Sequence, residues 1–118
     1  MGMAESYQDL LVWQRAIQMS LAIYRLTAGF PKEELFGLTS QIRRAGVSVA
    51  SNIAEGYGRL SNGEYKQFLG MARGSNLEAQ TQLVIAKELG YGNPQTLKEA
   101  EGLSIEVGKM LTAILKKL

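Results

Sequence analysis

The sequence predicts an all-α protein, specifically an antiparallel, up-down-up-down four-helix bundle. Three observations support this fold class. The chain of 118 residues contains only two prolines, its apolar residues recur every three or four positions in four separate segments, and no segment alternates as a strand would. Helices of roughly 20 residues are each about 30 Å long, and short links between them favour antiparallel neighbours. We therefore expect a single domain over residues 1–118.

The first predicted helix spans residues 7–28. Ser6 suits its N-cap, with Asp9 three residues further on, as in a capping box. Gly29 is expected to end it. Its expected core face is formed by Leu10, Trp13, Ile17, Leu21 and Tyr24. We interpret Trp13 and Tyr24 as packing residues rather than as rings that stack on bases.

The second predicted helix, residues 32–57, differs from an ordinary amphipathic helix. Pro31 suits its start, and the glycines at 56 and 58 suit its end. Two of its three stripes are apolar or small, and only the third is polar: Gln41, Arg44, Ser48, Asn52, Glu55 and Arg59. A helix that is apolar over most of its circumference needs neighbours on several sides, which favours an oligomer.

Capping signals define the last two helices. Ser61 and Glu64 have capping-box spacing and open a helix over residues 62–89. Asn93 followed by a proline opens another over residues 94–117, whose last lysines, Lys116 and Lys117, complement the helix dipole. Gly70 and Gly74 lie four apart on one face of the third helix. They would let another helix approach closely, either inside the bundle or from a second subunit.

Composition narrows the setting in which the protein works. The absence of cysteine excludes disulfides and thiolate metal sites and fits a reducing cytoplasm. No apolar run approaches the ~20 residues that span a bilayer, so we expect no membrane association. The first six residues match a myristoylation pattern, but we interpret Met1 and Gly2 as a cloning remnant before Met3. The net charge is +2, and the basic excess lies before Ser75, which hints at an anionic partner.

The residue inventory argues against catalysis. The chain has no histidine, which removes the usual acid–base group, the Ser-His-Asp triad and the di-metal sites of some helical bundles. Glu64 stands where the lysine of a phosphate-binding loop is required after Gly58 and Gly63. No serine is followed by lysine three residues later. We therefore expect a protein that is not an enzyme and that uses no cofactor or metal.

A row of polar residues remains on the second helix. Ser48, Asn52 and Glu55 lie three and four apart, and we interpret them, with Glu78 on the third helix, as a structural hydrogen-bond network. A ligand-binding row and a solvated face are the alternatives. For Arg73, an ion pair with Glu55 or Glu78 and an outward position as a phosphate clamp both remain open.

Several motifs, taken together, resemble a known family. They are Leu10-x-Val12-Trp13-Gln14-x-Ala16, Phe30-Pro31-x-Glu33, Leu38-Thr39-Ser40-Gln41-x-Arg43-Arg44-Ala45, Ser48-x-x-Ser51-Asn52-Ile53-Ala54-Glu55-Gly56, Phe68-Leu69-x-x-Ala72-Arg73-Gly74-Ser75 and Ala86-Lys87-Glu88-Leu89-Gly90-Tyr91. Over nearly its whole length the chain resembles the bacterial 23S rRNA-intervening sequence proteins. The family name describes a genomic context rather than an activity. Gly46 and Ala50 depart from the family pattern, which has alanine and proline there, and the loss of that proline removes an expected irregularity.

The resemblance implies a four-helix subunit that assembles into a homopentameric ring. It also implies kinship with the accessory variability determinant proteins of diversity-generating retroelements, which bind nucleic acid and a reverse transcriptase. Two hypotheses follow for this chain. The first is binding of nucleic acid, favouring structured RNA over DNA, through phosphates and with little sequence specificity, at Arg43, Arg44, Arg59, Lys66 and Arg73. The second is a scaffold that presents a helical surface to another protein.

Overall fold

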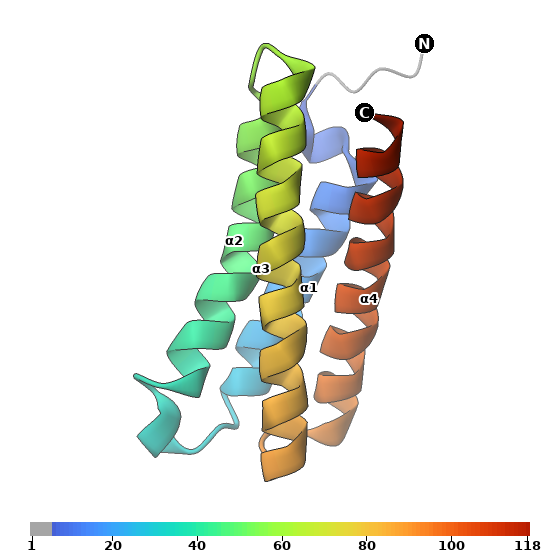
Figure 1. Ribbon diagram of the computed structural model, residues 1–118. Helices are drawn as coiled ribbons and strands as arrows, with labels where there is room; N and C mark the ends of the chain where they lie inside the picture. Colours follow the sequence, from blue (N-terminus) through green and yellow to red (C-terminus); the bar gives the residue numbers. More distant parts are fainter. Residues whose placement is uncertain (1–5) are drawn as a thin grey trace.

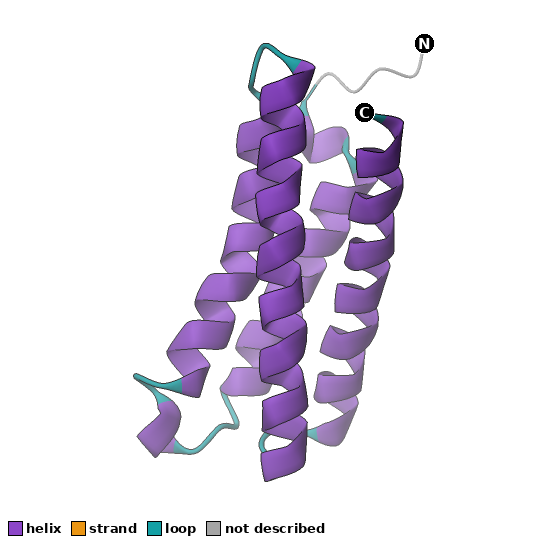
Figure 2. Cartoon of the chain, in the orientation of Figure 1, coloured by secondary structure: helices purple, strands orange, loops and turns teal. Residues whose placement is uncertain are grey.

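In a computed structural model, residues 6–118 form four long helices and two short 3-10 turns. The long helices are α1 (Leu11–Thr27), α2 (Leu38–Tyr57), α3 (Asn62–Leu89) and α4 (Pro94–Lys117), and the turns are η1 (Tyr7–Asp9) and η2 (Lys32–Glu34). Figure 1 shows successive helices running antiparallel, and Figure 2 shows short loops joining them. The predicted four-helix bundle is confirmed. The interpretations of Met1, Gly2 and Met3 lie outside the described residues.

Each helix packs against two others, so that the bundle has four grooves. α1 contacts α2, α2 contacts α3, α3 contacts α4, and α4 closes the arrangement on α1. The molecule measures 46 × 23 × 21 Å. We name each groove by its two helices, which gives the α1/α2, α2/α3, α3/α4 and α1/α4 grooves. The α2–α3 loop and the end of α4 lie at the same end of the bundle (Figure 1).

The core is built from aliphatic residues of all four helices, separated by alanines. Fully buried large side chains include Met19, Ile23, Ile42, Ile53, Leu69, Leu83 and Leu111. Burial of each such side chain contributes about 1.5–3 kcal/mol. Leu21 and Tyr24, predicted on the core face of the first helix, are instead 53% and 44% exposed. The face that α1 buries is centred on Met19 and Ile23. Leu21 and Tyr24 therefore lie beside the buried face.

The second helix begins six residues later than predicted. Lys32–Glu34 forms the separate turn η2, and Gly37 interrupts the helix with φ −115° and ψ −114°. The Glu34 carboxylate explains the break, because its Oε1 accepts a hydrogen bond from the Leu38 amide at 3.1 Å. A Cβ on Gly37 would lie 2.8 Å from that oxygen. α2 then runs without interruption through Ala50, where the family pattern has proline.

The first helix also begins later than predicted. The Ser6 hydroxyl does cap a helical turn, but that turn is η1, where it accepts from the Gln8 amide at 3.1 Å. Leu10 then adopts an extended conformation, with φ −74° and ψ 125°, and α1 starts at Leu11. Asp9 therefore lies in η1 and does not form the predicted capping box.

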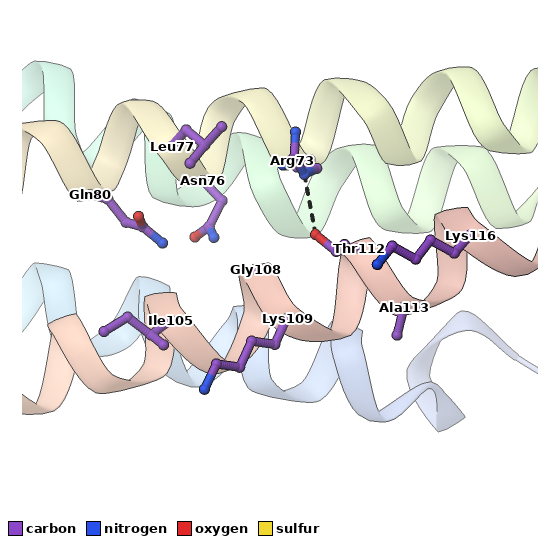
Figure 3. A pocket seen from close by; sticks show the side chains of 10 residues that line it. All are labelled: Arg73, Asn76, Leu77, Gln80, Ile105, Gly108, Lys109, Thr112, Ala113 and Lys116. Carbon is purple, nitrogen blue, oxygen red and sulfur yellow. Dashed lines mark hydrogen bonds between the residues drawn. The ribbon is translucent and has the colours of Figure 1, made fainter.

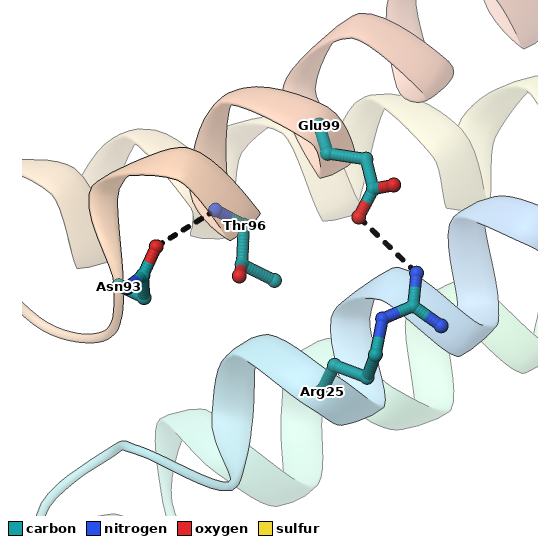
Figure 4. A network of polar contacts seen from close by, with 4 residues as sticks. All are labelled: Arg25, Asn93, Thr96 and Glu99. Carbon is teal, nitrogen blue, oxygen red and sulfur yellow. Dashed lines mark hydrogen bonds and ion pairs between the residues drawn. The ribbon is translucent and has the colours of Figure 1, made fainter.

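The predicted caps of the last two helices are confirmed. The Ser61 hydroxyl accepts from the Glu64 amide at 3.2 Å, and Gly90 ends α3 with φ 74°, a conformation that favours glycine. Asn93 Oδ1 accepts from the amides of Gln95 and Thr96 at 2.9 and 3.2 Å, the second of which appears in Figure 4. Within the described residues, no helix is both long and apolar enough to cross a membrane.

Candidate nucleic-acid interface

The predicted polar network is present in part and includes one residue that the sequence did not indicate. The Ser48 hydroxyl lies 2.8 Å from that of Ser75 on α3. Asn52 Nδ2 donates to the Ser48 carbonyl at 2.9 Å and to its hydroxyl at 3.0 Å. Glu55 is exposed and forms an ion pair with Arg59 at 3.1 Å. Glu78 is also exposed and lines a shallow part of the α2/α3 groove. Ser48 and Asn52 therefore link α2 to α3, whereas Glu55 and Glu78 face solvent.

Two of the five candidates, Arg43 and Arg59, have guanidinium groups that lie over an aromatic ring of the subunit. Arg43 Nε donates to Thr27 Oγ1 at 2.7 Å, and its guanidinium lies 4.5 Å from the centre of the Tyr24 ring. The guanidinium of Arg59, besides its ion pair, lies 4.6 Å from the centre of the Phe68 ring. Both charges are therefore already partly compensated, the first by a hydroxyl and a π-face and the second by a carboxylate.

Of the other three candidates, Lys66 and Arg73 lie seven residues apart on one side of α3, whereas Arg44 lies on α2. Arg44 is exposed in the α2/α3 groove beside Gln41, and Lys66 is exposed near the start of α3. Arg73 Nε donates to Thr112 Oγ1 of α4 at 3.2 Å, so that it faces the α3/α4 groove. Of the alternatives for Arg73, the ion pairs with Glu55 and Glu78 are wrong. The five candidates do not form one surface.

The α3/α4 groove holds a basic site that the sequence did not indicate. It contains a hollow of about 500 Å³, shown in Figure 3. Three cations line it, namely Arg73, Lys109 and Lys116, and no carboxylate does. None of the three forms an ion pair within residues 6–118. Its remaining lining is polar or apolar: Asn76, Leu77, Gln80, Ile105, Gly108, Thr112 and Ala113.

The three cations follow one another along the groove. Lys109 and Lys116 are seven residues apart on α4, which is about 10 Å along the helix axis. Arg73 is bonded to Thr112, which lies between the two lysines in the sequence of α4. In Figure 3 the Lys116 side chain runs back along α4 towards Thr112. We call these three residues the cation row; they come from two helices, and in Figure 3 the Lys109 side chain runs away from Arg73.

A buried hydrogen-bond network forms the floor of this groove. Asn76 Nδ2 donates to the Ser104 carbonyl at 2.9 Å, and the Ser104 hydroxyl donates to Asn76 Oδ1 at 2.9 Å. Gln80 Nε2 donates to the same carbonyl at 3.3 Å. A Cβ on Gly108 would lie only 3.1 Å from Asn76 Nδ2. The glycine therefore leaves space for the amide and keeps the floor open.

Two carboxylates of α4 face α1 rather than this hollow. Glu106 and Glu99 face α1, where they form ion pairs with Arg15 at 3.0 Å and with Arg25 at 3.1 Å. Figure 4 shows the second of these pairs. α4 thus turns these two carboxylates towards α1, whereas its unpaired lysines at 109 and 116 are among the residues that line the hollow.

The α1/α2 groove has a different character. A hollow of about 280 Å³ there is lined only by uncharged residues, which are Tyr7, Trp13, Ile17, Ser20, Val47, Ala50, Ser51 and Ala54. Trp13 is partly buried against the core and meets the Tyr7 ring edge-on, with the ring centres 5.2 Å apart. An uncharged, partly apolar groove is suited to contact with protein.

Gly70 and Gly74 take no part in packing within the bundle. Both are exposed, and a Cβ built on either would find no atom within 4 Å. Of the two alternatives for this pair, close approach inside the bundle is wrong for this subunit.

Within the described residues there is also no group of three or more side chains that could hold a metal ion.

Comparison with known proteins places this geometry in a family. The sequence model described as "23S rRNA-intervening sequence protein" matches residues 8–113. A crystal structure of a protein of unknown function from the S23 ribosomal protein family of Bacteroides thetaiotaomicron has the same fold, with a TM-score of 0.80. It is 22% identical, and the alignment covers 90% of this chain and 99% of the other. No curated protein gives a match.

Proposed function

Because the chain belongs to the 23S rRNA-intervening sequence protein family, whose description names no reaction, we propose a function from the physical properties of its surface. We propose that the protein is a non-enzymatic homo-oligomer of the bacterial cytoplasm. It binds nucleic acid, and structured RNA in particular, through phosphate contacts at basic residues.

The observation that carries this proposal is the acid-free row of cations in the α3/α4 groove. An unpaired cation loses no ion pair when it meets a phosphate, and it releases the counter-ions of that phosphate on binding. Arg73 can meet a phosphate with its two terminal nitrogens, because its Nε is occupied by Thr112. Arg44 on α2 and Lys66 on α3 are further exposed cations outside this hollow. Arg43 and Arg59 contribute less, since their charges are engaged within the subunit.

Assembly of several subunits would add together their small net charges. The family resemblance implies five subunits, and five chains of net charge +2 carry +10. Two different surfaces suit such contacts, namely the uncharged α1/α2 groove and the exposed glycine face of α3 at Gly70 and Gly74. A contact between two different surfaces is head-to-tail and closes into a ring when the rotation allows.

The proposal is tested by reversing charge inside and outside the groove. We expect Lys109→Glu with Lys116→Glu to weaken binding of a structured RNA about tenfold or more, measured by fluorescence anisotropy between about 50 and 200 mM salt. The matched control is Lys32→Glu with Lys98→Glu, which changes net charge equally at exposed lysines outside this hollow. Equal losses in both doubles, or no binding by the unmodified protein at low salt, would contradict the proposal.

A second function is favoured by one observation, the uncharged α1/α2 groove. In this alternative the oligomer is a protein-interaction scaffold, and the polar residues Ser48 and Asn52 serve only its structure. A scaffold would show no salt-dependent RNA binding. Its partner would instead be lost on Val47→Glu, which places a charge in that groove, in a variant that retains the wild-type α3/α4 groove.

A further inference from the structure

We infer that the α3/α4 groove accommodates an unpaired nucleotide of a single-stranded RNA segment, with the base in an apolar hollow beside the cation row. The inference rests on the proposed function, because it assumes that the cations bind RNA phosphates. It goes further by assigning a place for the base and by selecting unpaired over duplex RNA.

The apolar hollow continues the basic one along the same groove. It has a volume of about 230 Å³ and is lined by Gln80, Leu83, Val84, Glu101 and Ile105. Gln80 and Ile105 also line the basic hollow, so the two are contiguous. An extended ligand can therefore occupy both at once.

Exposed aliphatic side chains from both helices form the walls of this continuous groove. Leu77 and Val84 of α3 are 46% and 53% exposed, and Ile105 of α4 is 52% exposed. Covering such side chains with a flat ring removes apolar surface from water. Enzymes that extrude a base hold it between apolar or aromatic side chains in the same way. The groove thus offers an apolar surface whose nearest cations are Arg73 and Lys109, which matches a base next to its own phosphates.

Gln80 adds a polar group between the two hollows. Its Nε2 is held by the Ser104 carbonyl at 3.3 Å, which fixes the orientation of the amide. Within residues 6–118, the hydrogen bond of the Gln80 side chain is the one made by Nε2, so its Oε1 can accept a hydrogen bond from a base amino group. The side chain reaches from α3 into the groove in Figure 3.

The acid in the apolar hollow does not oppose an anionic strand. Glu101 is paired with Lys87 at 3.8 Å, and its side chain is 25% exposed. It precedes Lys109 by eight residues on α4, or about 12 Å along the axis. The phosphates would lie at the Arg73 end, and only the base would approach Glu101.

The combination of features selects an unpaired strand. In an A-form duplex the bases are stacked, and side chains reach mainly phosphates and 2′-hydroxyls. A duplex could therefore touch the cations but could not fill the apolar hollow. An unpaired nucleotide can do both. Its phosphates and its base would therefore both contribute to the binding affinity, whereas only the phosphates of a duplex would.

The test compares three ligands with equal numbers of phosphates on the full chain in its native assembly. They are a 12-nucleotide unpaired RNA, a blunt-ended and fully paired RNA duplex, and an abasic strand that keeps the sugar-phosphate backbone. We expect the unpaired RNA to bind about tenfold more tightly than the abasic strand, because removing roughly 55 Å² of apolar surface from water gives about that factor. We expect the duplex to resemble the abasic strand.

The variant Leu77→Ser with Ile105→Ser removes the apolar walls at exposed positions. We expect it to bind all three ligands like the abasic strand, with unchanged circular dichroism. Leu21→Ser with Leu89→Ser is the matched control, since these leucines are 53% and 54% exposed outside the two hollows, and it should retain the preference.

Each other outcome has a distinct meaning. Equal affinities for the unpaired and abasic strands would overturn the base site and leave phosphate binding intact. Failure of all three ligands to bind at low salt would overturn the proposed function itself. Adenosine monophosphate that binds as tightly as the 12-nucleotide strand would overturn the assignment to a strand.

Discussion

At the residue scale, the buried pair of Asn76 and Ser104 determines the shape of the candidate site. Asn76 is 1% exposed and Ser104 is fully buried, yet each satisfies the other through two hydrogen bonds between α3 and α4. Polar groups are buried at low cost only when they are paired in this way. The pair holds α3 and α4 close together at Gly108, and it orients Gln80 through the shared Ser104 carbonyl.

The first residue-scale prediction concerns this pair. We expect Asn76→Ala to lower the free energy of unfolding by about 1–3 kcal/mol, because it leaves the buried Ser104 hydroxyl without a partner. Urea denaturation followed by circular dichroism measures the loss. Adding Ser104→Ala should recover part of it, since both partners are then absent. A double variant whose loss equals or exceeds the sum of the two single losses would contradict this account.

At the element scale, one carboxylate determines where α2 begins. Glu34 accepts from the Leu38 amide through Oε1 and from the Tyr91 hydroxyl through Oε2 at 3.1 Å. Tyr91 lies 57 residues away along the chain, in the link between α3 and α4. The start of the second helix therefore depends on a contact with a different loop. Proline at 31 gave a local signal for an earlier start, and the long-range contact overrode it.

The element-scale prediction is a pH dependence. The hydrogen bond to Glu34, followed by desolvation, raises the pKa of Tyr91 above its usual value of 10.0. A raised folded-state pKa stabilises the fold below the pKa of the unfolded chain, and this stabilisation is lost as the pH rises through the folded-state value. We expect the difference in melting temperature between the wild type and Tyr91→Phe to be constant below pH ~9 and to shrink above pH ~10. A difference that stays constant up to pH 11 would show that the bond does not stabilise the fold.

At the scale of the whole molecule, the four grooves divide the chemistry of the surface. Carboxylates and arginines pair in the α1/α4 groove, unpaired cations line the α3/α4 groove, and the α1/α2 groove is lined by uncharged residues. The net charge of the chain is thus small, although three unpaired cations line the hollow in the α3/α4 groove. This separation lets one face bind an anionic ligand while another contacts protein.

The whole-molecule prediction tests the proposed assembly. We expect Gly70→Ala with Gly74→Ala to stabilise the isolated subunit by about 1 kcal/mol per substitution, because each position is open and alanine is the better helix former. If the glycine face contacts another subunit, the same methyl groups obstruct it and reduce the mass measured by light scattering. Gly63→Ala, also open and in the first turn of α3, is the control and should leave the mass unchanged. A double variant that keeps the wild-type mass would exclude this face from the interface.

The sequence by itself determined the helical class, the four-helix count and the ends of α3 and α4. Apolar periodicity and capping residues such as Ser61 and Asn93 act within one or two turns, so they can be interpreted without knowing the neighbours of a helix. The family resemblance was likewise available from local motifs. For the candidate site, the sequence indicated Arg73 but attributed Lys116 to the helix dipole and did not single out Lys109.

Only the tertiary structure decided which residues meet across the bundle. The spacing of the lysines on α4 was visible in the sequence. The sequence did not indicate that Arg73 lies opposite Thr112, nor that Glu99 and Glu106 face α1. The break before Leu38 likewise depended on a contact with Tyr91. These features depend on how far each helix is rotated about its axis and on which helix lies beside it. Both are set by packing of the whole core, and no local signal in the chain specifies them.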